Sequence, residues 1–247
     1  MDADLKTVQN LIAESNNIVF FGGAGVSTAS GIPDFRSATG LTQKLRSSPY
    51  APEKLLSHAF LMEHPAEFYD FHLRNLVARD AQPNQAHLAL ASLEKEGKLK
   101  AVITQNVDGL HQKAGSRRVI ELHGNTFSFY CMACNKVYDP AYVEKAGRLP
   151  PLCTRCGGIV RPDVVLYGEA LKMENLQKAI RAIQKADVFI VGGTSLVVYP
   201  AAGLLNHYKG DKLLIINHTP TAYDSRANYV IHGKIAEVLP ALFGISH

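Results

Sequence analysis

The sequence predicts an α/β protein with a doubly wound, mainly parallel sheet and a smaller lobe. Short apolar runs alternate with amphipathic stretches along most of the 247 residues, and the first apolar run ends in a glycine-rich turn. Strand patterns that alternate with helical patterns are typical of a parallel sheet covered by helices on both faces. Two segments interrupt this alternation, and one of them contains all four cysteines. We therefore expect a second, smaller unit beside the sheet.

The N-terminal part of the chain begins the pattern. Apolar residues recur at helical spacing between Leu5 and Ile12, and the apolar run Ile18–Phe21 then meets the glycine-rich segment Gly22–Gly25. This periodicity predicts a helix, then a buried strand, then a tight glycine turn.

The rest of the chain continues the alternation. Further apolar runs predict strands at 100–104, 119–122, 187–191 and 212–216. Amphipathic stretches predict helices at 84–96, 172–185 and 199–208.

The two interruptions define the expected domains. Residues 37–80 are loop-like and then helical, whereas 126–160 contain the cysteines. We expect 37–80 to form a helical module and 126–160 a zinc-binding module, which together make the small domain. The large nucleotide-binding domain would then consist of 1–36, 81–125 and 161–247. A cleft between two lobes is a common ligand site.

Composition and charge favour an ordinary globular protein. Hydrophobic residues make up 47% of the chain and charged residues 19%, and the formal net charge is only +4. Nucleic-acid-binding proteins usually carry a denser basic patch, so we expect no nucleic-acid partner. The start of the chain has no export pattern and no apolar run approaches membrane-spanning length. We therefore expect a cytoplasmic monomer that has no membrane contact.

The cysteines are the clearest metal signal. Cys131 with Cys134, and Cys153 with Cys156, form two Cys-x-x-Cys pairs. Such pairs can close a tetrahedral site around one zinc ion, although two disulfides or four unrelated buried thiols would also fit the count. A four-thiolate shell has no open coordination position, so we expect one structural zinc ion and chemistry elsewhere.

The glycine-rich turn is a weaker signal. Gly23-Ala24-Gly25 would let main-chain N–H groups approach a phosphate closely. The usual dinucleotide pattern continues to a third glycine, but position 28 is Thr, and no acidic residue follows a second strand about 20 residues later to hold a ribose. The turn alone therefore leaves a nucleotide site and a structural turn both open.

Six blocks of residues together resemble the sirtuin family, the NAD-dependent protein lysine deacylases, of bacterial type. In chain order they are residues 23–27 with 30–36, residues 104–111, His123-Gly124, the four cysteines, residues 161–165 with Gly168-Glu169, and residues 193–196 with Pro200. The resemblance implies a Rossmann-like large domain and a small domain made from a zinc module and a helical module.

The resemblance also implies a reaction. The acyl oxygen of an acetylated lysine in a protein or peptide would attack the nicotinamide ribose of NAD, nicotinamide would leave, and the acetyl group would end on ADP-ribose. His123 would act as general base, because an imidazole accepts and returns protons near neutral pH. Asn106 would orient the ribose or a water, and Asp108 would hold the nicotinamide amide with the main chain of Ile32 and Val107. Capping of a helix start is the structural alternative for Asp108.

The resemblance further assigns contact residues. The NAD contacts would be Gly23, Ala24, Gly25, Thr28, Phe35, Arg36, Gln105, Val107, Asp108, His123, Gly193, Thr194, Ser195, Asn217 and Ile235. The substrate contacts would be Val164, Val165, Tyr167, Gly168 and Val197. Main-chain pairing with a peptide tolerates many sequences, so target proteins are not predicted.

Two departures from the family pattern concern the acyl group. Tyr167 stands where Phe is usual. Relatives that remove acidic acyl groups have Tyr and Arg three residues apart in the helical module, whereas here Tyr69 is followed at that spacing by His72, with Arg74 two further on. We therefore expect acetyl-lysine to be preferred over succinyl-lysine.

Four other functions remain to be distinguished. A protein mono-ADP-ribosyltransferase or a deacylase of longer acyl groups could use the same cleft. A zinc-ribbon adaptor that binds DNA or protein would lack catalysis, and a dehydrogenase would produce NADH without a peptide.

Overall fold

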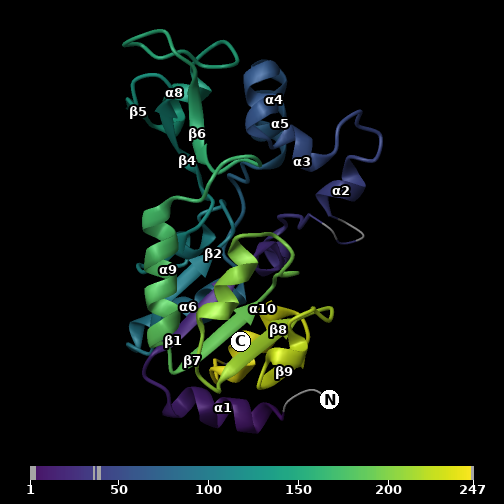
Figure 1. The fold of residues 1–247 in the computed structure, drawn as a ribbon, viewed down its shortest axis with the longest axis vertical. Helices are drawn as coiled ribbons and strands as arrows, with labels where there is room; N and C mark the ends of the chain where they lie inside the picture. Colours follow the sequence, from purple (N-terminus) through teal and green to yellow (C-terminus); the bar gives the residue numbers. More distant parts are fainter. Residues whose placement is uncertain (1–3, 36, 38–39, 246–247) are drawn as a thin grey trace.

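The computed structural model describes residues 4–35, 37 and 40–245. Its main sheet has six parallel strands in the order β3-β2-β1-β7-β8-β9 (Figure 1). The strands are β1 (Ile18–Gly22), β2 (Leu99–Thr104), β3 (Val119–Glu121), β7 (Val188–Gly192), β8 (Leu213–Asn217) and β9 (Tyr229–His232). The strand order reverses direction at β1, which lies between β2 and β7. Open parallel sheets bind ligands at the carboxyl ends of the strands beside such a reversal.

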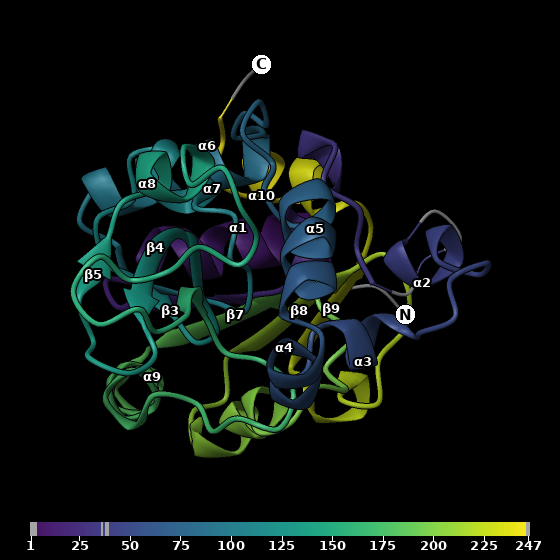
Figure 2. The same cartoon turned by 90° about the horizontal axis from the view of Figure 1, so that it is seen from above.

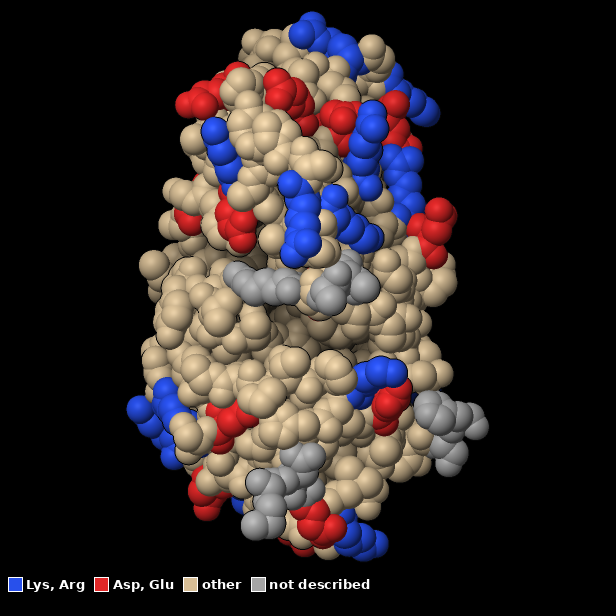
Figure 3. Space-filling model, turned by 90° about the vertical axis from the view of Figure 1, so that its right-hand side faces the viewer, with Lys and Arg blue, Asp and Glu red and all other residues tan. Residues whose placement is uncertain are grey.

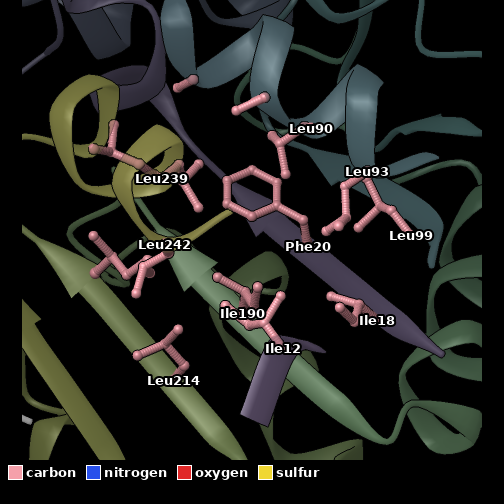
Figure 4. Close-up of a cluster of buried hydrophobic side chains, with 14 of the residues drawn as sticks. Ile12, Ile18, Phe20, Leu90, Leu93, Leu99, Ile190, Leu214, Leu239 and Leu242 are labelled. Atoms are coloured by element: carbon pink, nitrogen blue, oxygen red, sulfur yellow. The ribbon is translucent and has the colours of Figure 1, made fainter. Parts of the chain in front are cut away.

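Helices cover both faces of this sheet. On one face, α1 (Leu5–Glu14), α6 (Gln85–Lys95) and α10 (Ile235–Leu242) contribute to the buried cluster that Figure 4 shows. On the other face, α9 (Met173–Lys185) and the 3₁₀ helix η3 (Ala201–His207) form a second cluster. Every residue of β1 and β7 is buried, as expected for parallel strands that are covered on both sides.

The small lobe combines an antiparallel sheet with a helical module, which lie side by side in Figure 2. The sheet has the order β5-β4-β6, and its strands are β4 (Gly124–Cys131), β5 (Val137–Tyr138) and β6 (Val160–Val164). Helix α8 (Pro140–Glu144) follows β5. The helical module consists of α2 (Leu41–Lys44), α3 (Pro52–Leu55), α4 (His58–Glu63) and α5 (Pro65–Asn75).

The two modules of the small lobe share one hydrophobic core. Phe60 and Phe68 of the helical module are buried in the same cluster as Phe129 and Val160 of the zinc module. The small lobe is therefore one packed unit, although two separate segments of the chain build it.

Short helices connect the larger elements. They are η1 (Ala24–Val26), η2 (Thr28–Ser30), α7 (Leu110–Lys113) and η4 (Asp224–Arg226). Within the described residues, no helix combines the length and the apolar character that a membrane crossing needs.

The structure confirms the predicted α/β fold and its strands at β1, β2, β3, β7 and β8. The stretch predicted as a helix at 199–208 forms η3, which has 3₁₀ rather than α geometry. The sequence pattern predicts neither β9 nor α10. Strands β4 and β6 cross the expected domain boundaries after residues 125 and 160, so the division at those points stays a prediction.

Candidate active site and metal centre

The carboxyl ends of the central strands face the small lobe. Figure 3 shows a hollow across the middle of one face of the molecule, with Lys and Arg side chains above it. Most residues that the sequence assigns to catalysis and NAD follow β1, β2, β3 and β7, at the edge of the sheet where a ligand is expected.

The glycine turn after β1 meets the turn after β7. The main-chain N–H of Gly25 donates to the carbonyl oxygen of Gly193 over 2.8 Å. A Cβ at Gly25 would lie 2.8 Å from that same oxygen, and a Cβ at Gly193 would lie 2.6 Å from the nitrogen of Val26. Gly193 also has φ of +61°, a conformation that side chains disfavour. Glycine is therefore required at both positions for the two turns to touch.

A side-chain contact joins the ends of β2 and β7. The side-chain amide of Gln105 donates to the hydroxyl of Thr194 over 3.1 Å. Ala24 and Gln105 are half-buried, Thr194 is buried and Thr28 is exposed. The structure thus brings these four predicted NAD residues to the same end of the sheet.

A hydrogen-bonded network holds Asp108 and Asn106. The hydroxyl of Ser27 donates to Oδ2 of Asp108 over 2.7 Å and accepts from the Asn106 side chain over 3.0 Å. Oδ1 of Asp108 accepts from the N–H of Leu110 over 2.9 Å, while Gly109 occupies the N-cap position of α7. Asp108 therefore binds the first N–H of α7 without occupying its N-cap position, and it has a fixed place in the site. The sequence motifs assign no role to Ser27, and its position in the glycine-rich block is the signal that points to it.

His123 follows β3 and is held from two sides. Its Nδ1 lies 2.9 Å from the main-chain carbonyl oxygen of Gln105, and its own carbonyl accepts from the N–H of Val165 over 2.9 Å. A carbonyl can only accept, so Nδ1 carries the proton and Nε2 is the free base in the neutral ring. Burial lowers the pKa of His123, and the hydrogen bond with Gln105 partly opposes that shift.

Two predicted NAD contacts pack against the hydrophobic core of the small lobe. Phe35 is half-buried and packs against the core of the small lobe. Val107 is half-buried, and its carbonyl accepts from both the N–H and the hydroxyl of Thr126, each over 3.0 Å. Arg36 lies outside the described residues.

Three further predicted NAD contacts lie on the side of β7 and β8. Ser195 is exposed after β7, and Asn217 ends β8, where its side chain donates to the carbonyl of Thr219 over 2.9 Å. Ile235 begins α10 and is only 5% exposed. A Cβ on Gly192 would lie 2.3 Å from Cδ1 of Ile235, so this side chain packs directly on the end of β7.

The predicted substrate segment is extended and anchored to both lobes. After Val164 ends β6, Val165 donates its N–H to His123. Tyr167 forms a parallel bridge with Ser57 of the helical module. Gly168 follows with φ of +90°, and Val197 lies in the loop after β7 with 52% of its surface exposed.

The acyl-selectivity residues of the helical module do not form an anion site. The Tyr69 side chain is fully buried and donates its hydroxyl to the carbonyl of Val160. His72 is also fully buried, and burial lowers its pKa to about 4, so it is neutral at pH 7. Arg74 is exposed and its guanidinium bonds Asp70 over 2.7 Å.

The four cysteines converge as predicted. All four Sγ atoms lie within 4.8 Å of one another, and the Cys131–Cys156 and Cys134–Cys153 pairs are 3.5 Å apart. Zinc bonds of about 2.3 Å in a tetrahedron separate sulfurs by about 3.8 Å, so this set fits a four-thiolate zinc site. The separations exceed a disulfide bond, which would bring two sulfurs to about 2 Å.

Comparisons with known proteins agree with this geometry. The Sir2 family model matches residues 23–200. An NAD-dependent protein deacetylase of Clostridium tetani is 55% identical to the chain over 234 residues, which cover 95% of each protein. A protein of that name from Staphylococcus aureus is 47% identical over 242 residues, covering 98% of this chain and 99% of the relative.

Solved structures give the same result. A structure described as the structural basis for the mechanism and regulation of Sir2 enzymes has a TM-score of 0.88 and 42% identity, covering 98% of this chain and 96% of that one. A Sir2 complex with a p53 peptide and NAD⁺ has a TM-score of 0.87 and 39% identity, covering 99% of this chain and all of that one. With its sequence blocks, fold and cysteine cluster all in agreement, the chain belongs to the Sir2 family.

Proposed function

We propose that this chain is an NAD-dependent protein lysine deacetylase that transfers the acetyl group of acetyl-lysine to ADP-ribose and releases nicotinamide. Its relatives from Clostridium tetani and Staphylococcus aureus carry the name NAD-dependent protein deacetylase. A solved Sir2 structure, 39% identical with a TM-score of 0.84, contains 2'-O-acetyl-ADP-ribose and a deacetylated p53 peptide. These relatives support NAD as co-substrate and acetylated lysine in a protein or peptide as the substrate.

The observation that carries the proposal is the hydrogen bond between His123 and Gln105. This bond fixes the ring so that Nε2 is the free base. The lowered pKa keeps the imidazole neutral at pH 7 and therefore ready to accept a proton from a ribose hydroxyl. We assign His123 as the general base.

Asn106 and Asp108 would fix the geometry of NAD in the same site. Both bond Ser27, so neither side chain is free to rotate without breaking that network. Fixed positions matter because attack at the ribose needs the incoming oxygen and the leaving nitrogen nearly in line, and a misplacement of about 1 Å can cost on the order of a hundredfold in rate. We assign Asn106 to the ribose or a water, and Asp108 to the nicotinamide amide.

The peptide would pair with the main chain of the segment 164–168. In the described part of the chain, neither the carbonyl of Val165 nor the N–H of Gly168 has a hydrogen-bond partner. An added peptide strand uses free main-chain groups of this kind. Val197, across the loop after β7, would contact the same peptide from the other side.

Zinc would be bound by the four cysteines and would stabilise the small lobe. Its closed shell supplies no step of the reaction. Reduced thiolates of this kind are typical of proteins in the cytoplasm, where we propose this protein resides. A monomeric state remains our prediction.

One product analysis tests the proposal. The metal-loaded protein is incubated with NAD and an acetyl-lysine peptide, and peptide mass, nicotinamide and acetylated ADP-ribose are measured. We expect loss of the acetyl group with one nicotinamide released per peptide, and loss of this turnover in His123→Ala. ADP-ribose added to protein would instead identify a transferase, and NADH formation a dehydrogenase. Unchanged NAD and unchanged peptide would reject the enzyme altogether.

A further inference from the structure

We infer that Asn84, a residue outside the NAD contacts assigned above, is a positioning residue for the cofactor loop 24–30. The inference rests on the proposed function, because it assumes that this loop binds NAD. Asn84 precedes helix α6, and it lies 58 residues along the chain from Val26, whose carbonyl it binds. It reaches the loop from the start of α6.

The side chain of Asn84 uses both ends of its amide. Oδ1 accepts from the N–H of Ala86 over 2.9 Å, which caps α6. Nδ2 donates to the carbonyl oxygen of Val26 over 2.8 Å and to the hydroxyl of Ser30 over 2.9 Å. The main-chain N–H of Asn84 points to Nδ1 of His87 over 3.3 Å, which completes a capping box. The amide is thereby held in one orientation, with its NH₂ group aimed at the loop.

Asn84 contacts the loop at the last residue of each 3₁₀ turn. Val26 ends η1 and Ser30 ends η2, so Asn84 ties together the ends of the two 3₁₀ turns. Ser27 lies between them and bonds both Asp108 and Asn106. A shift of the loop would therefore move the hydroxyl that orients both of these side chains.

Besides Asn84, the loop is held by the bond between Gly25 and Gly193 and by the bonds of Ser27 with Asp108 and Asn106. Within η1 and η2, Val26 is the only buried residue, and neither helix has a side-chain hydrogen bond at its N-cap. A flexible loop must be ordered when ligand binds, and that ordering reduces affinity. Asn84 would keep the loop ordered before NAD arrives, so its loss should weaken NAD binding and leave peptide binding unchanged.

The test separates capping from positioning. Asn84→Ser keeps a good N-cap for α6 but removes both donations to the loop. We expect the KM for NAD to rise about 25-fold, as for the loss of two neutral hydrogen bonds, with the KM for the acetyl peptide unchanged. Calorimetry with NAD alone should show the same loss of affinity. Ser30→Ala, which removes one of the two contacts, should show a smaller rise.

Asp4→Ala is the control for stability. Asp4 caps α1 by accepting from the N–H of Thr7, and it is remote from the loop in the fold. This variant should lower the unfolding temperature without changing the KM for NAD. If Asn84→Ser leaves the KM for NAD within twofold of wild type, or raises both KM values equally, the positioning role is rejected. A wild-type protein that consumes no NAD would reject the proposed function instead, before any variant is compared.

Discussion

The side-chain amide of Gln105 donates to the hydroxyl of Thr194 across the end of β1. Gln105 follows β2 and Thr194 follows β7, the two neighbours of β1, so this bond spans the glycine turn between them. A Cβ on Gly23 would lie 2.8 Å from Cβ of Thr194, which shows how closely the two turns approach. The polar edge of the sheet is thus assembled from residues distant in the sequence.

Thr194→Val should weaken NAD binding. Valine has nearly the same shape but cannot accept from Gln105, and one neutral hydrogen bond contributes about 1 kcal/mol, or roughly a fivefold change in an equilibrium constant. We expect the KM for NAD to rise by about that factor, measured from initial rates at saturating peptide. Thr194→Ser keeps the hydroxyl and should stay close to wild type. Equal KM values for the Val and Ser variants would contradict the role of this bond.

Catalysis should depend on pH through His123. Burial lowers its pKa below the usual 6.5, and the base must be neutral to act. We therefore expect the acid limb of kcat/KM to be centred below pH 6.5. His123→Ala should remove this acid limb together with at least about 99% of the turnover, since general base catalysis contributes about 10²–10⁴-fold. A limb centred above pH 7 would show that His123 is not the titrating base.

Three other histidines should make stability depend on pH. His72, His87 and His111 are buried, and burial lowers their pKa values to about 4, about 4 and about 3. In the unfolded chain they take up protons below pH 6.5, so unfolding consumes protons as the pH falls from 6.5 toward 4. These groups do not reduce the free energy of unfolding well above pH 6.5. Below pH 6.5 each of them lowers it by up to about 1.4 kcal/mol per pH unit.

His72→Phe tests this pH dependence. His72 stacks on Phe68 with ring centroids 5.9 Å apart, and in the described structure neither ring nitrogen has a partner. Phenylalanine removes the protonation cost, so urea unfolding should show a gain in stability that is about 1–2 kcal/mol larger at pH 5 than at pH 8. The exposed His218 provides the control, because His218→Phe should give no such difference. A pH-independent gain in His72→Phe would contradict the assignment.

Metal removal should destabilise the small lobe. Cys131 is fully buried in the core that both modules share, and structural zinc contributes on the order of 10 kcal/mol to the folding of small domains. We expect one zinc per chain by native mass spectrometry, and loss of both zinc and activity in Cys131→Ser. Thr154→Ser, next to the metal ligand Cys153, should retain both. A fully active protein without zinc would contradict this prediction.

Acetyl peptides should be better substrates than succinyl peptides. The hydroxyl of Tyr69 bonds Val160, and Arg74 bonds Asp70, so neither is available for an acidic acyl group. His72 is neutral at pH 7. We expect kcat/KM for the acetyl peptide to exceed that for a succinyl peptide of the same sequence, measured by mass spectrometry. Equal or faster succinyl turnover would show that another cation serves the acyl group.

The sequence predicts the central strands well because their burial is simple. β1 and β7 are covered on both faces, and a continuous apolar run can hardly form anything else there. β9 is a half-buried edge strand of four residues, and α10 is a short, apolar helix that contains Pro240, so neither shows a clear period. β4 alternates irregularly, because its register against β6 shifts between Gly124 and Phe129, and its last residue, Cys131, belongs to the cysteine cluster.

The site residues also divide into those that the sequence predicts and those that it does not. The cysteines and His123 stand in recognisable spacings, and the resemblance to known motifs assigns them. Ser27 and Asn84 act through partners 81 and 58 residues away, Asp108 and Val26. No local pattern encodes such a contact, since it depends on how the loop after β1 packs against α6 and α7.

The chain passes between the lobes more than once, at places that include Phe35, His123 and the segment after Val164. These joints are also residues assigned to NAD, to catalysis and to the peptide. Any rotation of one lobe relative to the other must change the backbone conformation of these connecting segments together. It must therefore also change the geometry of the site. A ligand that contacts these connecting segments would in turn restrain any such movement of the lobes.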